Sequence, residues 1–219
     1  MKFAMSYSCG KDSTLALHKM RAMGHAPVCL VVMVNESVGR SYFHGADQAM
    51  LRAYEKALGI PMILCHATAD TYQTAFEAGL AKARAMGAEA ACFGDIDILS
   101  NRQWEEDRCL AAGLRPFFPL WQNSRKENVW ELLSLGYQCQ IKSINAVLLP
   151  KSLLGRSIDS ETISIMQAAD IDICGENGEY HTLVVDGPVF KTPLALQAGD
   201  ILDFGDYAAI DLKLKEVAL

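Results

Sequence analysis

Six residues near the start of the chain have the types and spacing of a phosphate-binding loop. Residues 8–13 read S-C-G-K-D-S and follow a short apolar stretch. Apolar Leu15, Leu17 and Met20 come next at near-helical spacing, so the segment predicts a strand, a turn and a helix. Such a helix start directs unpaired backbone N–H groups and a positive dipole at one point, where a phosphate can bind.

Each side chain of this segment has a chemical use beside a phosphate. Gly10 allows a close approach of the backbone, and Lys11 adds a point positive charge. Asp12 can hold a phosphate-bound Mg²⁺, while Ser8 and Ser13 supply hydroxyl groups. The pattern therefore predicts an enzyme that uses ATP and Mg²⁺.

The common P-loop is a different motif, and this sequence does not match it. The pattern G-x-x-x-x-G-K-[ST] needs glycine where Met5 stands and serine or threonine where Asp12 stands. A second interpretation is an ordinary capped helix after an edge strand, without any ligand. The position of the segment favours the nucleotide, because it follows the first strand of an expected open α/β sheet.

The first half of the chain alternates strands with helices. Apolar runs at 27–34, 60–65, 90–93 and 116–120 predict four more strands, and helices are expected at 46–58, 72–86 and 101–112. This alternation predicts an α/β fold with a five-stranded parallel Rossmann-like sheet. Ligands of such sheets bind at the carboxyl ends of the strands.

The polar segments of the first half all follow predicted strands. They are residues 8–13, 35–44, 66–70 and the pair Gly94-Asp95. Because parallel strands end at the same edge of a sheet, we expect Gly94 and Asp95 to lie close to the loop at 8–13. His44 faces either the nucleotide or the solvent, and the sequence does not decide between them.

The alternation stops near residue 122. A polar link at 123–126 precedes a short helix at 127–135, a strand-like stretch at 137–149, a helix at 159–169 and β structure from 200 onward. We therefore expect two domains, an ATP-binding domain over 1–122 and a smaller α+β substrate domain over 123–219.

A second group of reactive residues lies in this C-terminal part. Residues 175–182 read G-E-N-G-E-Y-H-T and bring Glu176, Glu179 and His181 into one glycine-hinged loop. Two carboxylates and an imidazole can bind ammonium, coordinate a cation or transfer protons near neutral pH. A polar turn with solvated glutamates is the alternative interpretation.

Composition restricts the class of protein. The 219 residues are 51% hydrophobic and carry a net charge of −6, which argues against a nucleic-acid surface. Seven cysteines without a C-x-x-C pair indicate reduced thiols. The longest aliphatic run, 28–34, is far shorter than the roughly 20 residues of a membrane span, and no signal peptide precedes the first strand. We expect a cytoplasmic protein without a membrane partner.

Several motifs in fixed order resemble one known family. F-G-D-I at 93–96, P-L-W at 119–121, L-G-R at 154–156, the loop at 175–182 and D-G-P at 186–188 together resemble the diphthine–ammonia ligase, or diphthamide synthase domain, family. Residues 8–13 are similar to the S-G-G-x-D-S PP-loop of the N-type ATP pyrophosphatases to which that family belongs. Cys9 stands where the first glycine of that loop is usual.

The resemblance implies an adenine nucleotide alpha hydrolase-like fold and a two-step reaction. ATP is cleaved between its α- and β-phosphates to adenylate the carboxylate of diphthine, a modified histidine of translation elongation factor 2. Ammonia then displaces AMP. The implied roles are Mg²⁺ binding for Asp12, pyrophosphate binding for the other residues of 8–13, a metal or ribose contact for Asp95, and orientation of acceptor and ammonia for Glu176, Glu179 and His181.

Two other functions stay open at this point. The enzyme can use the same chemistry on a different small-molecule acid, as a bacterial-type ATP pyrophosphatase would. Alternatively, the chain is a nucleotide sensor that holds ATP or AMP without turnover. The sequence also leaves open whether the chain forms a homo-oligomer.

Overall fold

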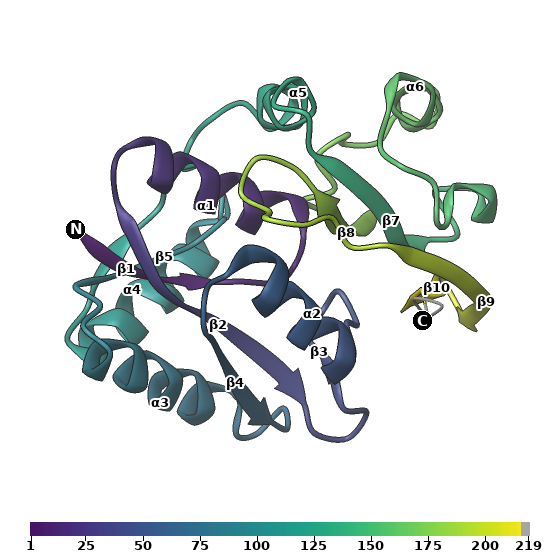
Figure 1. Ribbon diagram of the computed structural model, residues 1–219. Coiled ribbons are helices and arrows are strands. Elements are labelled where there is room, and N and C mark those ends of the chain that lie inside the picture. The colour runs from purple at the N-terminus through teal and green to yellow at the C-terminus, as the bar shows by residue number, and fades with distance from the viewer. Residues whose placement is uncertain (216–219) are drawn as a thin grey trace.

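The computed structural model describes residues 1–215 and contains two β-sheets (Figure 1). The first half of the chain forms β1 (Lys2–Ser6), α1 (Lys11–Ala22), β2 (Ala26–Asn35), β3 (Arg40–Ser41), α2 (Gln48–Leu58), β4 (Met62–Ala67), α3 (Tyr72–Ala85), β5 (Ala90–Cys92), α4 (Leu99–Ala112) and β6 (Arg115–Phe117).

Five of these strands form a parallel sheet in the order β4-β2-β1-β5-β6. The predicted five-stranded parallel α/β sheet is therefore confirmed. β3 was not expected, and it adds two residues antiparallel to the end of β2. β4 occupies one edge of β2, so β3 must pair on the same edge as β1. It does so beyond the carboxyl end of β1, which places the β2–β3 hairpin next to the loop that follows β1.

Helices cover both faces of the parallel sheet because β2 is apolar on both sides. Leu30 and Val32 belong to the core that contains the residues of α1 and α2, whereas Val31 and Met33 belong to the core that contains those of α3 and α4. The alternation of side chains along a strand produces this division. Figure 1 shows the two pairs of helices on opposite sides of the sheet.

The second half forms a four-stranded antiparallel sheet in the order β8-β7-β10-β9. Its elements are α5 (Arg125–Ser134), β7 (Gln138–Asn145), the 3₁₀-helix η1 (Lys151–Leu153), α6 (Ser160–Ala168), β8 (Tyr180–Asp186), β9 (Leu196–Phe204) and β10 (Tyr207–Leu214). The expected strand over 137–149 is shorter, because the Asn145 side chain accepts a hydrogen bond from the N–H of Val147 and starts a turn. The closing β structure begins at 196, earlier than expected.

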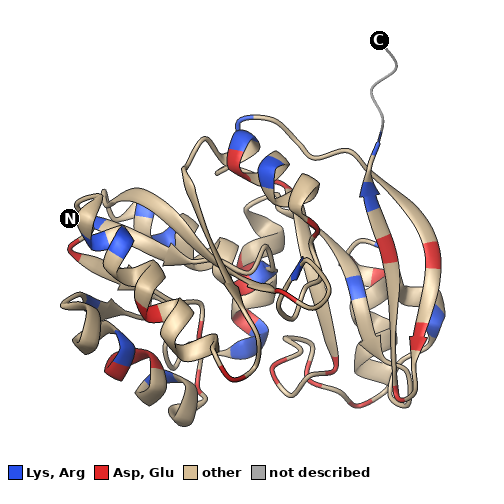
Figure 2. Ribbon diagram, turned by 90° about the horizontal axis from the view of Figure 1, so that it is seen from below, with Lys and Arg blue, Asp and Glu red and all other residues tan. Residues whose placement is uncertain are grey.

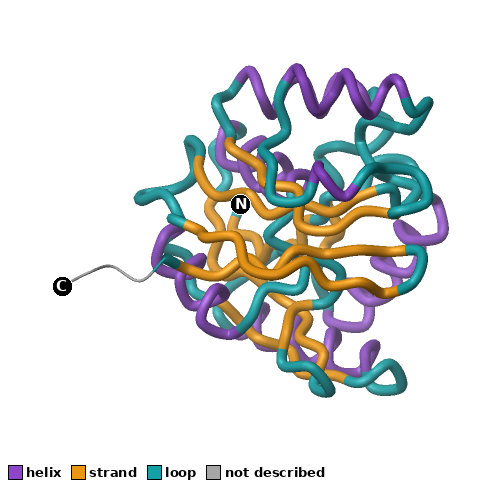
Figure 3. Tube along the Cα trace, turned by 90° about the vertical axis from the view of Figure 1, so that its right-hand side faces the viewer, coloured by secondary structure: helices purple, strands orange, loops and turns teal. Residues whose placement is uncertain are grey.

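The two sheets share one core. Buried side chains of α1, α2, β7, β8 and β10 belong to a single hydrophobic cluster, so the layer of α1 and α2 lies between the parallel and the antiparallel sheet. Figure 3 shows the molecule from the side of the antiparallel sheet, with strands at the centre and helices around them. The buried hydroxyl of Tyr54 on α2 donates a 2.7 Å hydrogen bond to the carbonyl of Val184 on β8.

Charged side chains are spread over both halves of the molecule, with basic and acidic residues mixed (Figure 2). Among the described residues, none of the helices has both the length and the apolar composition needed to cross a membrane. Neither half therefore carries a surface of one charge sign in this view.

The contact between α2 and β8 gives a first prediction. Tyr54→Phe leaves the buried carbonyl of Val184 without this donor, and we expect the free energy of unfolding to fall by about 1–3 kcal/mol. Urea unfolding followed by circular dichroism measures the change. The control is Tyr207→Phe, because the Tyr207 side chain is 48% exposed, and it should change stability by less than about 0.5 kcal/mol. Equal effects of the two substitutions would contradict the role of this hydrogen bond.

Candidate functional site

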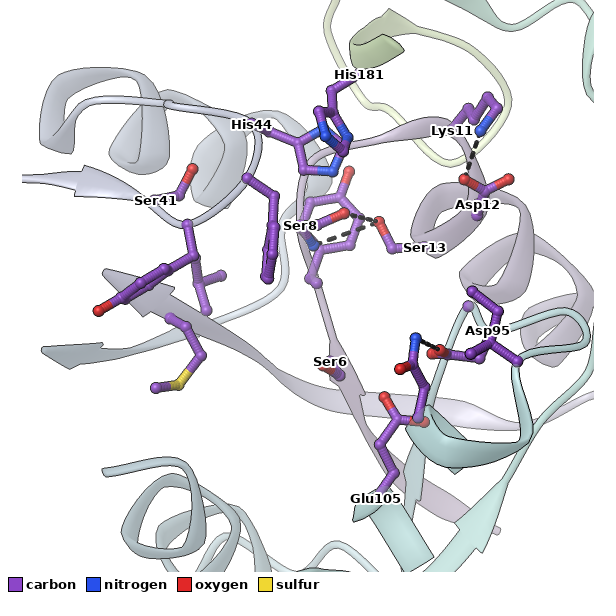
Figure 4. Close-up of a pocket in the computed structure, with 18 of the residues that line it drawn as sticks. Ser6, Ser8, Lys11, Asp12, Ser13, Ser41, His44, Asp95, Glu105 and His181 are labelled. Carbon is purple, nitrogen blue, oxygen red and sulfur yellow. Dashed lines mark hydrogen bonds and ion pairs between the residues drawn. The ribbon is translucent and has the colours of Figure 1, made fainter. Parts of the chain in front are cut away.

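A cavity of about 1030 Å³ opens at the carboxyl ends of β1, β2 and β5, where the two halves of the chain meet (Figure 4). Eight of the residues predicted from the sequence line it: Ser8, Lys11, Asp12, Ser13, Gly94, Asp95, Glu176 and His181. Cys9, Gly10 and Glu179 are not among its lining residues. The structure thus brings the loop at 8–13 and the loop at 175–182 to one place.

The N-terminus of α1 is open toward an anion. Gly10 is the N-cap and provides no side-chain cap. The hydroxyls of Ser8 and Ser13 lie 3.1 Å apart and hold the loop, since Ser13 also donates to the carbonyl of Gly10 at 3.1 Å. Among the described residues, the N–H groups of Asp12 and Ser13 have no hydrogen-bond partner. A phosphate would satisfy them.

Two glycines are needed for this arrangement because of close approaches. A Cβ at Gly94 would lie 2.8 Å from the amide nitrogen of Ser13, so any side chain there would cover the helix start. A Cβ at Gly10 would collide with the ring of His44. Glycine at position 94 therefore leaves the start of α1 uncovered, and glycine at position 10 makes room for the ring of His44.

Cys9 has a strained backbone conformation within the loop at 8–13. Its φ of 69° lies in the left-handed region, where glycine is usual. The side chain is fully buried, and burial raises the pKa of the Cys9 thiol far above its ordinary value. The thiol is therefore protonated at neutral pH and is no nucleophile, although it stands near a helix N-terminus. The carbonyl of Cys9 accepts a 2.9 Å hydrogen bond from Val184.

Lys11 and Asp12 form an ion pair of 2.7 Å at the edge of the cavity. Burial alone would lower the pKa of Lys11, but acidic neighbours, chiefly Asp12, raise it well above its usual value. Lys11 is therefore charged, and its ammonium lies 5.5 Å from the centre of the Tyr180 ring. This cation is available to the negative charge of a bound phosphate.

Asp12, Cys174 and Glu176 each place one ligand atom within 4.8 Å of the others. Burial raises the pKa of the Cys174 thiol, so this group stays protonated, and it donates to Asp12 at 3.8 Å. The two carboxylates are the hard oxygen donors that Mg²⁺ prefers, and Mg²⁺ in nucleotide sites typically takes one or two of them together with phosphate oxygens. The donor set at Asp12 and Glu176 fits such an ion.

Glu176 is the carboxyl group most suited to proton transfer. Burial and the nearby charge of Asp12 raise the pKa of Glu176 to about 7, while Lys11 acts in the opposite direction. A carboxyl group that titrates near neutral pH can both accept and release a proton.

Two histidines lie side by side on one wall of the cavity, with ring centres 5.1 Å apart and the rings in edge contact (Figure 4). The Nδ1–H of His44 donates to the carbonyl of Thr182 at 2.6 Å, so Nε2 carries no proton. Burial and then His181 lower the pKa of His44 to about 3, and burial followed by Lys11 lowers the pKa of His181. Both rings are neutral, and the position of His44, left open by the sequence, is in the cavity.

Glu179 has a different position from the rest of its loop. Its carboxylate accepts hydrogen bonds from the backbone N–H of Asn177 at 2.9 Å and from the Asn177 side chain at 3.0 Å. Only 5% of the residue is exposed. Glu179 therefore shapes the turn that presents Glu176, and it does not itself reach into the cavity.

The wall of the cavity beside Asp95 contains Glu105, which was not predicted as a site residue. Glu105 belongs to an acidic run that looks like a solvated helix start, yet it points to the cavity beside Asp95 (Figure 4). Burial raises the pKa of Asp95, and burial together with the charge of Asp95 raises the pKa of Glu105 to about 11. Glu105 is therefore a neutral acid, and Asp95 also accepts from Asn101 at 3.2 Å.

Arg125 at the start of α5 connects three segments around the site. Its guanidinium donates to both oxygens of Asp97 at 2.6 Å, to Asp172 at 2.7 Å and to the Asn177 side chain at 3.2 Å. Bidentate pairs of this kind fix direction as well as distance. The loop of Glu176 is thereby tied to the segment that follows β5, a link that sequence analysis did not identify.

Comparison with protein families assigns the chain to a class. The model of the diphthamide synthase N-terminal domain matches residues 1–116, and that of the diphthamide synthase C-terminal domain matches residues 125–216. The chain therefore belongs to the diphthamide synthase family, as its motifs indicated.

Curated relatives are named as ligases. The human diphthine–ammonia ligase is 24% identical over 227 residues, which cover 92% of this chain and 85% of the human protein. The Schizosaccharomyces pombe diphthine–ammonia ligase is 27% identical over 130 residues, 58% of this chain and 22% of the yeast protein. A crystal structure described as a predicted subunit of tRNA methyltransferase from Methanocaldococcus jannaschii aligns with a TM-score of 0.48 at 16% identity, covering 89% of this chain and all of that one.

The left-handed backbone at Cys9 can be tested with a pair of substitutions. Cys9→Ala and Cys9→Gly both remove the buried sulfur, but only glycine relieves the conformation. We expect the glycine variant to be more stable than the alanine variant by about 1 kcal/mol in urea unfolding. An alanine variant of equal or greater stability would show that residue 9 is not left-handed in solution.

The connection through Arg125 predicts a local change in dynamics. Arg125→Gln should leave the fold intact while amide hydrogen exchange within 172–178 accelerates about tenfold, because the loop loses its fixed partners. Mass spectrometry after proteolysis measures the exchange. Arg156→Gln is the control, since Arg156 makes a 2.9 Å pair with Glu161 away from the loop. Unchanged exchange in 172–178 would contradict a positioning role for Arg125.

Proposed function

We propose that the chain is an ATP-dependent carboxylate–ammonia ligase of the diphthine–ammonia ligase type. The observation that carries the proposal is the meeting of Lys11 and Asp12 with Glu176 and His181 in one cavity. One side of this cavity suits phosphates and the other suits an acceptor and ammonia. Its volume is at the upper end of the range for small-molecule sites, which leaves room for two reactants.

In the first step, the phosphates of ATP bind at the N-terminus of α1, against the free N–H groups of Asp12 and Ser13. A carboxylate oxygen of the acceptor attacks the α-phosphorus, and the bond from that phosphorus to the bridging oxygen breaks. Pyrophosphate leaves, and the ammonium of Lys11 neutralises the charge that develops on it. The product is an acyl-adenylate, which has a good leaving group.

Mg²⁺ would be held by Asp12, which leaves Glu176 for proton transfer, and would supply further positive charge to the phosphates. Lys11 keeps Asp12 oriented through their ion pair. The neutral thiol of Cys174 hydrogen-bonds to Asp12 and would not displace the oxygen ligands.

In the second step, ammonia attacks the carbonyl carbon of the adenylate, and AMP leaves. The nitrogen must lose a proton during this attack. Glu176 in its ionised form, or the neutral ring of His181, can accept that proton. Glu179 supports the step indirectly, because its contacts with Asn177 fix the loop that carries Glu176.

Diphthine on translation elongation factor 2 is the acceptor that we propose, since the relatives of the chain are named for diphthine. On this proposal, residues 1–122 bind ATP and residues 123–219 supply the side of the cavity that receives the acceptor. A modification of an elongation factor would take place in the cytoplasm.

The proposal predicts the products of the reaction. With ATP, Mg²⁺, ammonia and diphthine-bearing elongation factor 2, the protein should release AMP and pyrophosphate in equal amounts. Asp12→Asn should lower the rate by about 10²–10³-fold, because charge stabilisation at the phosphates is lost. Glu176→Gln should bind ATP yet form amide more slowly, by about 10²-fold or more. Chromatography of nucleotides and a pyrophosphate assay measure these quantities.

A matched control is Asp107→Asn, which removes an exposed carboxylate from α4. This substitution should leave both products unchanged. Steady release of ADP would contradict cleavage between the α- and β-phosphates. Tight binding of ATP without AMP formation in the presence of any acid would favour a nucleotide sensor. AMP formation with a small-molecule acid but not with elongation factor 2 would show that diphthine is not the acceptor.

A further inference from the structure

A second, smaller cavity of about 310 Å³ lies beside the first, between the β2–β3 hairpin and the antiparallel sheet. Its walls come from three places: the β2–β3 hairpin and the turn after it, β7, and the β9–β10 hairpin. The lining residues are Val38, Arg40, Phe43, His44 and Gly45, then Lys142 and Ser143, then Leu202, Phe204 and Ala209. Phe43 and His44 line both cavities, so a molecule bound here is next to the candidate active site.

The floor of this cavity contains a buried lysine without a counter-ion. Lys142 is only 5% exposed, and its ammonium donates to the backbone carbonyl of Ile210. Within residues 1–215 it forms no ion pair, although Asp211 and Asp47 are near, and Asp211 pairs instead with Arg40 at 3.0 Å and Lys213 at 3.2 Å. An unpaired buried charge is costly, so an anion that enters this cavity would be bound favourably.

The rim of the cavity is apolar and open to solvent. Phe43, in the turn after β3, is 69% exposed, and Phe204 on β9 is 65% exposed. Val38 and Leu202 also line the cavity and are 64% and 41% exposed. Large apolar side chains that gather at one exposed place mark an interaction site more often than scattered ones do.

β9 adds unpaired backbone groups to this surface. It is the last strand of the order β8-β7-β10-β9, and all its residues except Leu196 are exposed. Its outer edge has no strand partner among residues 1–215. An extended segment of another polypeptide could pair with this edge through main-chain hydrogen bonds.

We propose that this surface, comprising the β2–β3 hairpin, Lys142 and β9, docks an extended segment of the polypeptide that carries the acceptor. An acidic side chain of that segment would pair with Lys142, and apolar side chains would pack on Phe43 and Phe204. The inference rests on the proposed function, because a docked protein must place its acceptor carboxylate in the neighbouring main cavity.

A second copy of this chain fits the surface less well. Pairing of two β9 strands would bring Asp200 and Asp203 of one copy toward the same acidic residues of the other, and like charges across a strand pair are destabilising. A partner of different sequence avoids this repulsion.

The test uses the full chain and elongation factor 2 that carries diphthine, with binding measured by interferometry in the absence of ATP. Lys142→Met removes the charge and keeps the apolar stem, and Phe204→Ser removes the ring. Each should weaken binding about tenfold and raise KM for the protein acceptor by a similar factor. The dissociation constant for ATP should not change. Leu110→Ser, at a position on α4 that is 80% exposed, is the control and should alter neither quantity.

The outcomes separate the two proposals. Unchanged binding of elongation factor 2 by both variants would overturn the docking surface. A second outcome would also overturn it: sedimentation shows that the wild type is a dimer, and Phe204→Ser dissociates this dimer without changing the binding of elongation factor 2. The surface would then be the contact between two copies of the chain. Weakened binding in both variants, without AMP from any acceptor in the wild type, would support the docking surface and contradict the proposed function.

Discussion

Two hydrogen bonds join β8 to the loop that follows β1, a third joins β8 to the loop that follows β3, and the site depends on all three. The N–H of Val184 donates to the carbonyl of Cys9 at 2.9 Å, and the N–H of Lys11 donates to the hydroxyl of Thr182 at 3.2 Å. The ring of His44 donates to the carbonyl of Thr182. Because the loop of Glu176 leads directly into β8, fixing this strand also fixes the second set of reactive residues against the first. The distance between the two loops is set by these three bonds, each of which uses at least one backbone group.

Burial at this junction determines the charge of each reactive group. It raises the pKa of Glu176 into the neutral range and lowers the pKa of His44, while Glu105 is held as a neutral acid. Lys11 stays charged because its acidic neighbours outweigh the effect of burial. One enclosed place therefore contains a fixed cation, a proton acceptor and two neutral rings. This combination matches a reaction in which phosphate charge must be stabilised and ammonia must lose a proton.

Local sequence patterns were enough to predict the parallel sheet and the loop at its edge. Apolar runs alternating with helical spacing depend only on neighbours along the chain, and so does the open start of α1. The two-residue β3 could not be predicted in this way, because it exists only through its pairing with β2. Spacing also could not show that Glu179 turns inward to Asn177, that Glu105 faces the cavity, or that Arg125 joins three segments. The positions of Glu105 and Arg125 depend on residues distant in sequence, and that of Glu179 depends on the conformation of its own loop.

Transfer of oxygen from the acceptor to AMP tests the proposed chemistry most directly. Elongation factor 2 whose diphthine carboxylate contains ¹⁸O would be incubated with the protein, ATP, Mg²⁺ and ammonia, and the AMP would be analysed by mass spectrometry. Attack of the carboxylate on the α-phosphorus predicts that each AMP gains one ¹⁸O atom. AMP without the label, or label in inorganic phosphate, would contradict an acyl-adenylate and with it the use of the α1 N-terminus and the Glu176 loop as one active site.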